Sequence, residues 1–172
     1  MRWKGTTQLW LTLTKNNEGM FVPPAGRVYL IGVDVSSGTG NSNSVLSTID
    51  RATGEKVMQY VNPYIRPEAF AVLAVAYAKW FNNAKLIWES NGPGRQFGGK
   101  AMDLKYSNVY LRRRNESLSR KTTDIPGFAS TKEEKLFLLG KYSDALESGR
   151  FINRSPDALN ECLEYIFAQN GG

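Results

Sequence analysis

The chain has 172 residues, 41% hydrophobic and 22% charged, which predicts one folded domain and excludes a disordered chain. It contains no histidine and one cysteine, Cys162, so Ser-His-Asp triads, histidine metal sites, cysteine zinc clusters and internal disulfides are all excluded. No stretch approaches the roughly 18 to 20 apolar residues of a membrane span. The net charge of +6 fits a polyanionic partner.

The first half of the chain predicts a short lead-in followed by strands. Residues 1–26 mix Thr, Asn, Gly and Pro and are expected to form an N-terminal linker or lead-in segment, with one strand near 8–13. Residues 27–172 are expected to form a single domain. The almost continuous apolar run 28–35 predicts a central strand covered on both faces. Two further short strands with a turn between them predict a hairpin over 45–61.

The middle of the chain predicts alternating helix and strand. A proline and a glutamate follow Arg66, and apolar residues recur at helical spacing as far as Phe81, which predicts a helix. A strand at 84–89, a short helix at 97–104 and a strand at 108–111 are expected next. Residues 112–128 are polar and basic and predict a loop.

Two helices are expected at the end, over 131–148 and from Ser155 onward, where Ser155 is in the N-cap position. The strand and helix order is that of ribonuclease H. The sequence therefore predicts an α/β protein with a ribonuclease H-like, mixed five-stranded sheet and helices on both faces.

Two carboxylates stand at matching positions of this predicted fold. Asp34 ends the first buried strand and Glu89 ends the strand over 84–89. In the ribonuclease H order these strands are neighbours, so both side chains are expected at one edge of the sheet. Converging carboxylates bind Mg²⁺ or Mn²⁺, and two such ions can support phosphodiester hydrolysis without histidine. The simpler alternative is that Asp34 caps a loop and Glu89 pairs with a lysine.

Four segments, in order, resemble motifs of the large terminase nuclease domains of tailed phages. The segment Ile31-Gly32-Val33-Asp34, which precedes a Ser/Gly turn, is similar to the first acidic motif of that family. The segment Trp88-Glu89-Ser90-Asn91-Gly92-Pro93-Gly94 is similar to its second acidic motif. The stretch from Pro126 to Lys135 and the segment from Glu147 to Leu163 resemble later parts of that family. The resemblance covers roughly residues 27–168.

The resemblance implies a metal-dependent DNA endonuclease that cuts concatemeric DNA during genome packaging. It implies that Asp34 and Glu89 are catalytic ligands of a two-metal site holding Mg²⁺ or Mn²⁺. It also implies double-stranded DNA as substrate, the terminase small subunit and the portal protein as partners of the full-length protein, no membrane, and the cytoplasm of a bacterial host as the location. The third acidic ligand of the family is expected beyond residue 172, so the domain is expected to be truncated at its C-terminus.

Basic residues surround the predicted loop and are candidates for contact with the DNA backbone. A run of three arginines leaves the strand over 108–111 toward the carboxylate end of the sheet. The candidate DNA-binding residues are Lys100, Arg112, Arg113, Arg114, Arg120 and Lys121. A solvated loop is the alternative.

Two other functions remain open at this stage. Ser36–Gly40 resembles the phosphate loop of actin-like kinases and chaperone ATPases, so a ribonuclease H-fold nucleotide-binding protein is one alternative. Gly94–Lys100 has the spacing of a P-loop, but Ala101 stands where Ser or Thr would hold Mg²⁺, which favours a chance match. The other alternative is a truncated, inactive DNA-binding domain.

Overall fold

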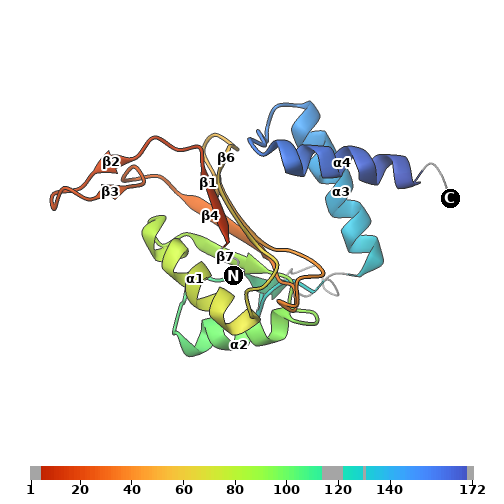
Figure 1. Ribbon diagram of the computed structural model, residues 1–172, viewed down its shortest axis with the longest axis horizontal. Helices are drawn as coiled ribbons and strands as arrows, with labels where there is room; N and C mark the ends of the chain where they lie inside the picture. Colours follow the sequence, from red (N-terminus) through yellow and green to blue (C-terminus); the bar gives the residue numbers. More distant parts are fainter. Residues whose placement is uncertain (1–4, 114–121, 130, 170–172) are drawn as a thin grey trace.

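A five-stranded mixed sheet forms the centre of the protein (Figure 1). The computed structural model describes residues 5–113, 122–129 and 131–169. The strand order is β1-β6-β5-β4-β7, in which β4 and β7 are parallel and the other pairs are antiparallel. The strands are β1 (Thr6–Leu9), β4 (Tyr29–Asp34), β5 (Ser44–Asp50), β6 (Lys56–Asn62) and β7 (Lys85–Trp88).

Helices lie on both faces of this sheet, as the sequence predicts (Figure 1). One face is covered by α1 and α2, and the other by α3 and α4. Two pairs of short strands, β2 with β3 and β8 with β9, lie outside the main sheet. The bounds are α1 (Pro67–Trp80), α2 (Gly94–Asp103), α3 (Lys132–Glu147), α4 (Pro156–Gln169), β2 (Thr14–Lys15), β3 (Phe21–Val22), β8 (Leu111–Arg113) and β9 (Thr122–Pro126).

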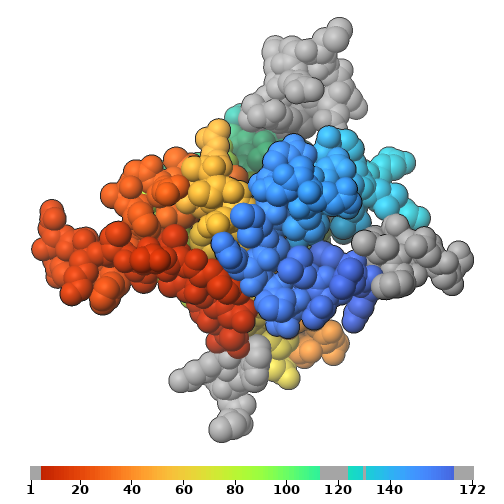
Figure 2. Space-filling model, turned by 90° about the horizontal axis from the view of Figure 1, so that it is seen from above, coloured from red at the N-terminus to blue at the C-terminus, as the bar shows by residue number. Residues whose placement is uncertain are grey.

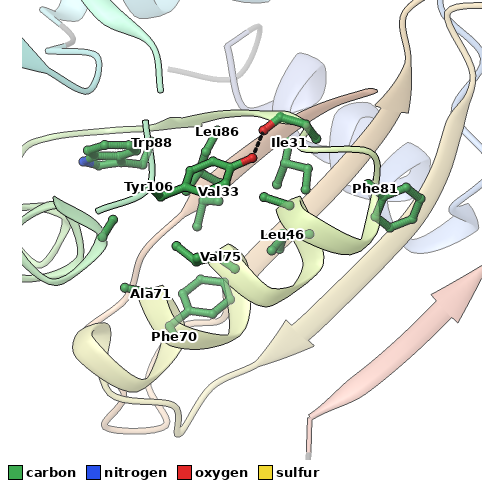
Figure 3. Close-up of a cluster of buried hydrophobic side chains, with 14 of the residues drawn as sticks. Ile31, Val33, Leu46, Phe70, Ala71, Val75, Phe81, Leu86, Trp88 and Tyr106 are labelled. Atoms are coloured by element: carbon green, nitrogen blue, oxygen red, sulfur yellow. Dashed lines mark hydrogen bonds between the residues drawn. The ribbon is translucent and has the colours of Figure 1, made fainter. Parts of the chain in front are cut away.

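The main hydrophobic core lies between the sheet and the α1/α2 layer. Its centre contains three aromatic rings: Phe97 lies 5.7 Å from Phe70 and 5.6 Å from Trp88, measured between ring centroids. Figure 3 shows this cluster, with the hydroxyl of Tyr106 donating to the carbonyl oxygen of Ala84 at 2.6 Å. This bond ties the segment after α2 to the start of β7. The layer is therefore fixed to the sheet at the start of β7.

The opposite face of the sheet is covered less tightly. Along β4, Tyr29, Ile31 and Val33 are buried, whereas Leu30 is half-buried and Asp34 is exposed. The expected central strand therefore has one fully buried face rather than two. None of the side chains of α3 is buried. A cavity of about 770 Å³ separates part of the sheet from α3 and α4.

Short contacts join the outer layer to the sheet. The backbone N–H of Lys56 donates to the carbonyl oxygen of Ile152 at 2.9 Å, and the N–H of Ile152 donates to the carbonyl oxygen of Gly54 at 3.0 Å. The ring of Tyr142 packs against Phe151 with centroids 5.5 Å apart. Figure 2, which looks onto this side, shows α3 and α4 over the middle of the molecule and the β2–β3 segment projecting from it.

The fifth strand differs from the one expected. Residues 6–9, rather than 108–111, complete the main sheet as β1, and they precede most of the strand predicted near 8–13. Residues 108–110 pair with β7 only around Leu86, whose N–H donates to Asn108 and whose carbonyl accepts from Tyr110, both at 2.9 Å. The two ends of the predicted basic loop form the strands β8 and β9, which pair antiparallel.

Within the described residues, none of the helices combines the length and the apolar character needed to cross a lipid bilayer.

Candidate active site

The two carboxylates predicted from the sequence lie side by side. The strands β4 and β7 are parallel, and Val33 pairs with Trp88, so Asp34 and Glu89 occupy the next matching positions. Side chains alternate between the faces of a sheet, and paired residues point the same way. Both carboxylates therefore point away from the buried Val33 and Trp88, toward α3. They line one cavity of about 370 Å³ together with Lys135 and Leu138 of α3.

A lysine and an asparagine contact Glu89. The ammonium nitrogen of Lys135 lies 3.3 Å from Glu89 Oε1. The side-chain amide of Asn91 donates to the same oxygen at 3.3 Å. These contacts hold the Glu89 carboxylate toward the cavity, where Ser47 of β5 and Phe128 also line the wall.

The surroundings of Asp34 disfavour the charged form of its carboxyl. Partial desolvation raises the pKa of Asp34, and the Glu89 carboxylate raises it further. The Lys135 ammonium and the backbone N–H of Val35 act in the opposite direction and lower it, but the net shift is upward. Two carboxylates held this close favour the binding of a cation.

The backbone around Glu89 is held by close contacts on both sides. The N–H of Ser90 donates to Phe128 and the N–H of Phe128 donates to Trp88, both at 2.7 Å. A Cβ atom at Gly94 would lie 1.7 Å from the carbonyl oxygen of Glu89, so only glycine allows α2 to begin this close to the site. The position of Glu89 therefore depends on the contacts of the next turn as well as on β7.

The donor set suits a hard divalent cation but is small. Asp34 and Glu89 offer carboxylate oxygens, which Mg²⁺ and Mn²⁺ prefer. Among the described residues, no group of three or more Asp, Glu, Cys or His side chains converges. Asp144 is exposed on α3, and Asp157 lines the larger cavity instead. The described part of the chain thus offers two candidate ligands at this site.

The basic residues proposed for DNA contact fall in different places. Arg112 of β8 contacts the residue next to Glu89, since its guanidinium donates to the Ser90 hydroxyl at 2.8 Å. Arg113 is also in β8. Lys100 lies in the last turn of α2, in the layer opposite α3. Arg114, Arg120 and Lys121 lie outside the described residues.

Glu89 does pair with a lysine, as the simpler alternative expected, but sequence reasoning did not identify Lys135 as that residue. It lies 46 positions beyond Glu89 and on a helix whose apolar spacing predicts packing alone. The signal nearest to it is the capping box that starts α3, in which Thr131 and Glu134 bond to each other's backbone N–H groups. That pattern fixes the start of the helix but does not reveal which side chain faces Glu89.

The segments singled out for nucleotide binding lie outside the cavity that Asp34 and Glu89 line. The segment with P-loop spacing is helical from Gly94 onward as α2, so it forms no phosphate-binding loop. Ser37 and Thr39 line a separate cavity of about 410 Å³, with Arg66 and Gln96. Glu68 lies in the same wall and opposes the binding of a polyphosphate.

Comparison with known proteins gives matches by structure alone. No protein-family model matches the sequence, and no curated protein is significantly similar to it. The large terminase nuclease of the thermophilic phage G20c with bound magnesium superposes with a TM-score of 0.64 and 15% identity, covering 90% of this chain and 74% of that one. The same nuclease with bound zinc gives a TM-score of 0.63 and 15% identity, covering 89% and 80% of the two chains.

A second phage protein gives the same result. The large terminase nuclease domain of Thermus phage P74-26 superposes with a TM-score of 0.60 and 14% identity, covering 89% of this chain and 70% of that one. The fold of this chain is therefore the ribonuclease H-like α/β fold of large terminase nuclease domains. The expected fold class and the likeness to these domains are both confirmed at the level of the fold.

Proposed function

We propose that this chain is a metal-dependent DNA endonuclease, the nuclease domain of a phage or prophage terminase large subunit that cuts concatemeric DNA during packaging. The observation that carries the proposal is the in-register pair of Asp34 and Glu89 at the ends of β4 and β7. Solved structures of one nuclease of the same fold, from phage G20c, contain bound magnesium, cobalt or zinc.

In this proposal Asp34 and Glu89 hold Mg²⁺ or Mn²⁺ and are the catalytic residues. A two-metal site is proposed, with further oxygen ligands from outside the described residues. When bound, the ions would activate water and stabilise the leaving oxygen of the phosphodiester. Asn91 orients the Glu89 carboxylate through its hydrogen bond to Oε1. Burial and then the Glu89 carboxylate raise the pKa of Asp34, and a bound metal ion would stabilise its charged form.

The proposed substrate is double-stranded DNA, held by its backbone phosphates. Arg112 has the best-supported role in this binding, because its bond to Ser90 places its guanidinium next to the proposed metal ligand Glu89. Arg113, Arg114, Arg120 and Lys121 are proposed to extend the same basic strip. Lys100 lies in the other layer and would reach only DNA that passes around the edge of the sheet. The small subunit and portal protein as partners, and the host cytoplasm as location, remain part of the proposal.

Cleavage of supercoiled plasmid with Mn²⁺, with Mg²⁺ and with EDTA tests the proposed chemistry. We expect metal-dependent nicking by the unmodified chain and a loss of at least 100-fold in Asp34→Asn and Glu89→Gln, because each substitution removes one of two charged ligands. Asp144→Asn is the matched control, since Asp144 is an exposed carboxylate outside the site.

Three results separate the alternatives. Cleavage that survives both substitutions would place the chemistry elsewhere. No cleavage, with DNA binding intact, would favour the inactive DNA-binding domain. Binding of ATP to the unmodified chain would favour the nucleotide-binding alternative.

A further inference from the structure

The site contains a cation of its own. The Nζ atom of Lys135 lies 3.3 Å from Glu89 Oε1, and Lys135 lines the same cavity as Asp34. It also lowers the pKa of the Asp34 carboxyl, so its charge acts on both carboxylates. Lys135 is thus placed where its positive charge offsets part of the negative charge of Asp34 and Glu89.

The position of this lysine is fixed by the start of α3. Thr131 caps the helix and Glu134 completes the capping box with bonds of 3.1 and 2.8 Å. Lys135 follows directly, and its N–H donates to the carbonyl of Thr131 at 3.0 Å. The backbone of Lys135 is therefore held, while its long side chain is free to rotate.

A divalent ion and the ammonium compete for the same oxygen atoms. Carboxylate ligands bind Mg²⁺ or Mn²⁺ at about 2.0–2.2 Å, and a lysine at hydrogen-bond distance from the same oxygen would be repelled by the ion. The Lys135 side chain is 58% exposed, so it can leave Glu89 at little cost. Glu89 Oε1 also accepts a hydrogen bond from the side-chain amide of Asn91. Because this amide is uncharged, its hydrogen bond need not break when metal binds.

We propose that Lys135 occupies the cation position of the Asp34–Glu89 pair in the metal-free protein, and that divalent metal binds by displacing its ammonium group. The inference rests on the proposed function, since it assumes that these carboxylates are the metal ligands. It adds that Lys135 sets the metal affinity of the site and offsets part of its negative charge before metal binds.

Calorimetric titration of the full chain with Mn²⁺, without DNA, tests this exchange. We expect Lys135→Met and Lys135→Gln to bind Mn²⁺ roughly 2- to 5-fold more tightly than the unmodified chain, because no exposed ion pair has to be broken first. Lys135→Arg keeps the charge and should bind like the unmodified chain. Lys132→Met is the control, as it removes the same charge from an exposed position of the same helix turn.

Thermal unfolding gives a second readout that does not depend on activity. Lys135→Met should lower the melting temperature of the metal-free protein and increase the rise that Mn²⁺ produces. Equal or weaker Mn²⁺ binding by Lys135→Met and Lys135→Gln would overturn the exchange, while leaving the proposed function intact. If the unmodified chain binds no Mn²⁺ at all, the proposed function itself is wrong, and the exchange with it.

Discussion

Asp34 is a residue whose placement suits a ligand better than it suits a stable fold. Its carboxyl is partly desolvated beside Glu89, and both effects raise its pKa above the ordinary value. In the folded chain the protonated form is therefore favoured more than in the unfolded chain. The charged form, which dominates at neutral pH in the unfolded chain, makes folding less favourable.

Asp34→Asn should therefore stabilise the metal-free protein at pH 7. The stability that protonation of Asp34 provides is present below about pH 4, the unfolded pKa, and is lost as the pH rises from there through the higher folded pKa. We expect the melting temperature of Asp34→Asn to exceed that of the unmodified chain by roughly 1–3 °C at pH 7, and the two to coincide near pH 3. Melting curves across this range measure it. A gain that persists undiminished at pH 3 would contradict the electrostatic explanation.

The two acidic residues were predictable from the sequence, and their partner was not. Asp34 and Glu89 each end a hydrophobic run, and strand order alone brings such positions to one edge. The contact of Lys135 with Glu89 depends instead on the angle at which α3 crosses the sheet. Local sequence does not specify that angle, because tertiary packing determines it.

At the scale of elements, the start of α2 holds the backbone of Glu89 and the turn after it in place. The helix begins at Gly94, directly against the carbonyl of Glu89, and continues with Phe97 and Gly98 packed on Trp88. The strand that carries Glu89 and the helix that follows it therefore share one contact region. A change in one is transmitted to the other.

Gly94→Ala tests this coupling, with Gly99→Ala as its match in the same helix. A methyl group at Gly94 would meet Glu89 O at 1.7 Å, whereas one at Gly99 would meet nothing within 4 Å. We expect Gly94→Ala to cost about 1–3 kcal/mol and to weaken Mn²⁺ binding as Glu89 shifts. Gly99→Ala should gain about 0.5–1 kcal/mol from helix propensity. Urea unfolding and calorimetry measure both; equal behaviour of the two variants would refute the close contact.

Element types were easier to predict than their packing. The helix expected over 131–148 is present as α3, but none of its side chains is buried. Apolar residues at 136–139 surround the helix axis, so its periodicity gives no single buried side. The four residues of β1 alternate too little in hydrophobicity to stand out, and their pairing with β6 comes from a distant segment.

At the scale of the whole molecule, the fold brings part of the positive charge close to the Asp34–Glu89 pair. The net charge of +6 gives the protein a general attraction for a polyanion. The β8 strand brings part of that charge next to Glu89 through the bond between Arg112 and Ser90. Composition predicted the attraction, but only the three-dimensional arrangement gives it a direction.

Arg112→Gln should weaken binding of double-stranded DNA and reduce its dependence on salt. Loss of one phosphate contact lowers the slope of log affinity against log salt concentration by about 1. Lys79→Gln, an exposed lysine in the last turn of α1, should leave the slope unchanged. Fluorescence anisotropy in Ca²⁺ or EDTA measures binding apart from cleavage. Equal slopes for the two variants would argue against DNA contact at Arg112.

The short edge strand β1 has a further consequence for how the protein behaves in concentrated solution. It hydrogen-bonds along β6 from Met58 to Val61, covering an edge that is rich in apolar residues. Its own outer edge is only four residues long and mostly polar. An uncovered apolar edge pairs readily with strands of other molecules, whereas a short polar one does not. The segment that carries β1 thus protects the sheet against aggregation, a role separate from the candidate site at the other edge of the sheet.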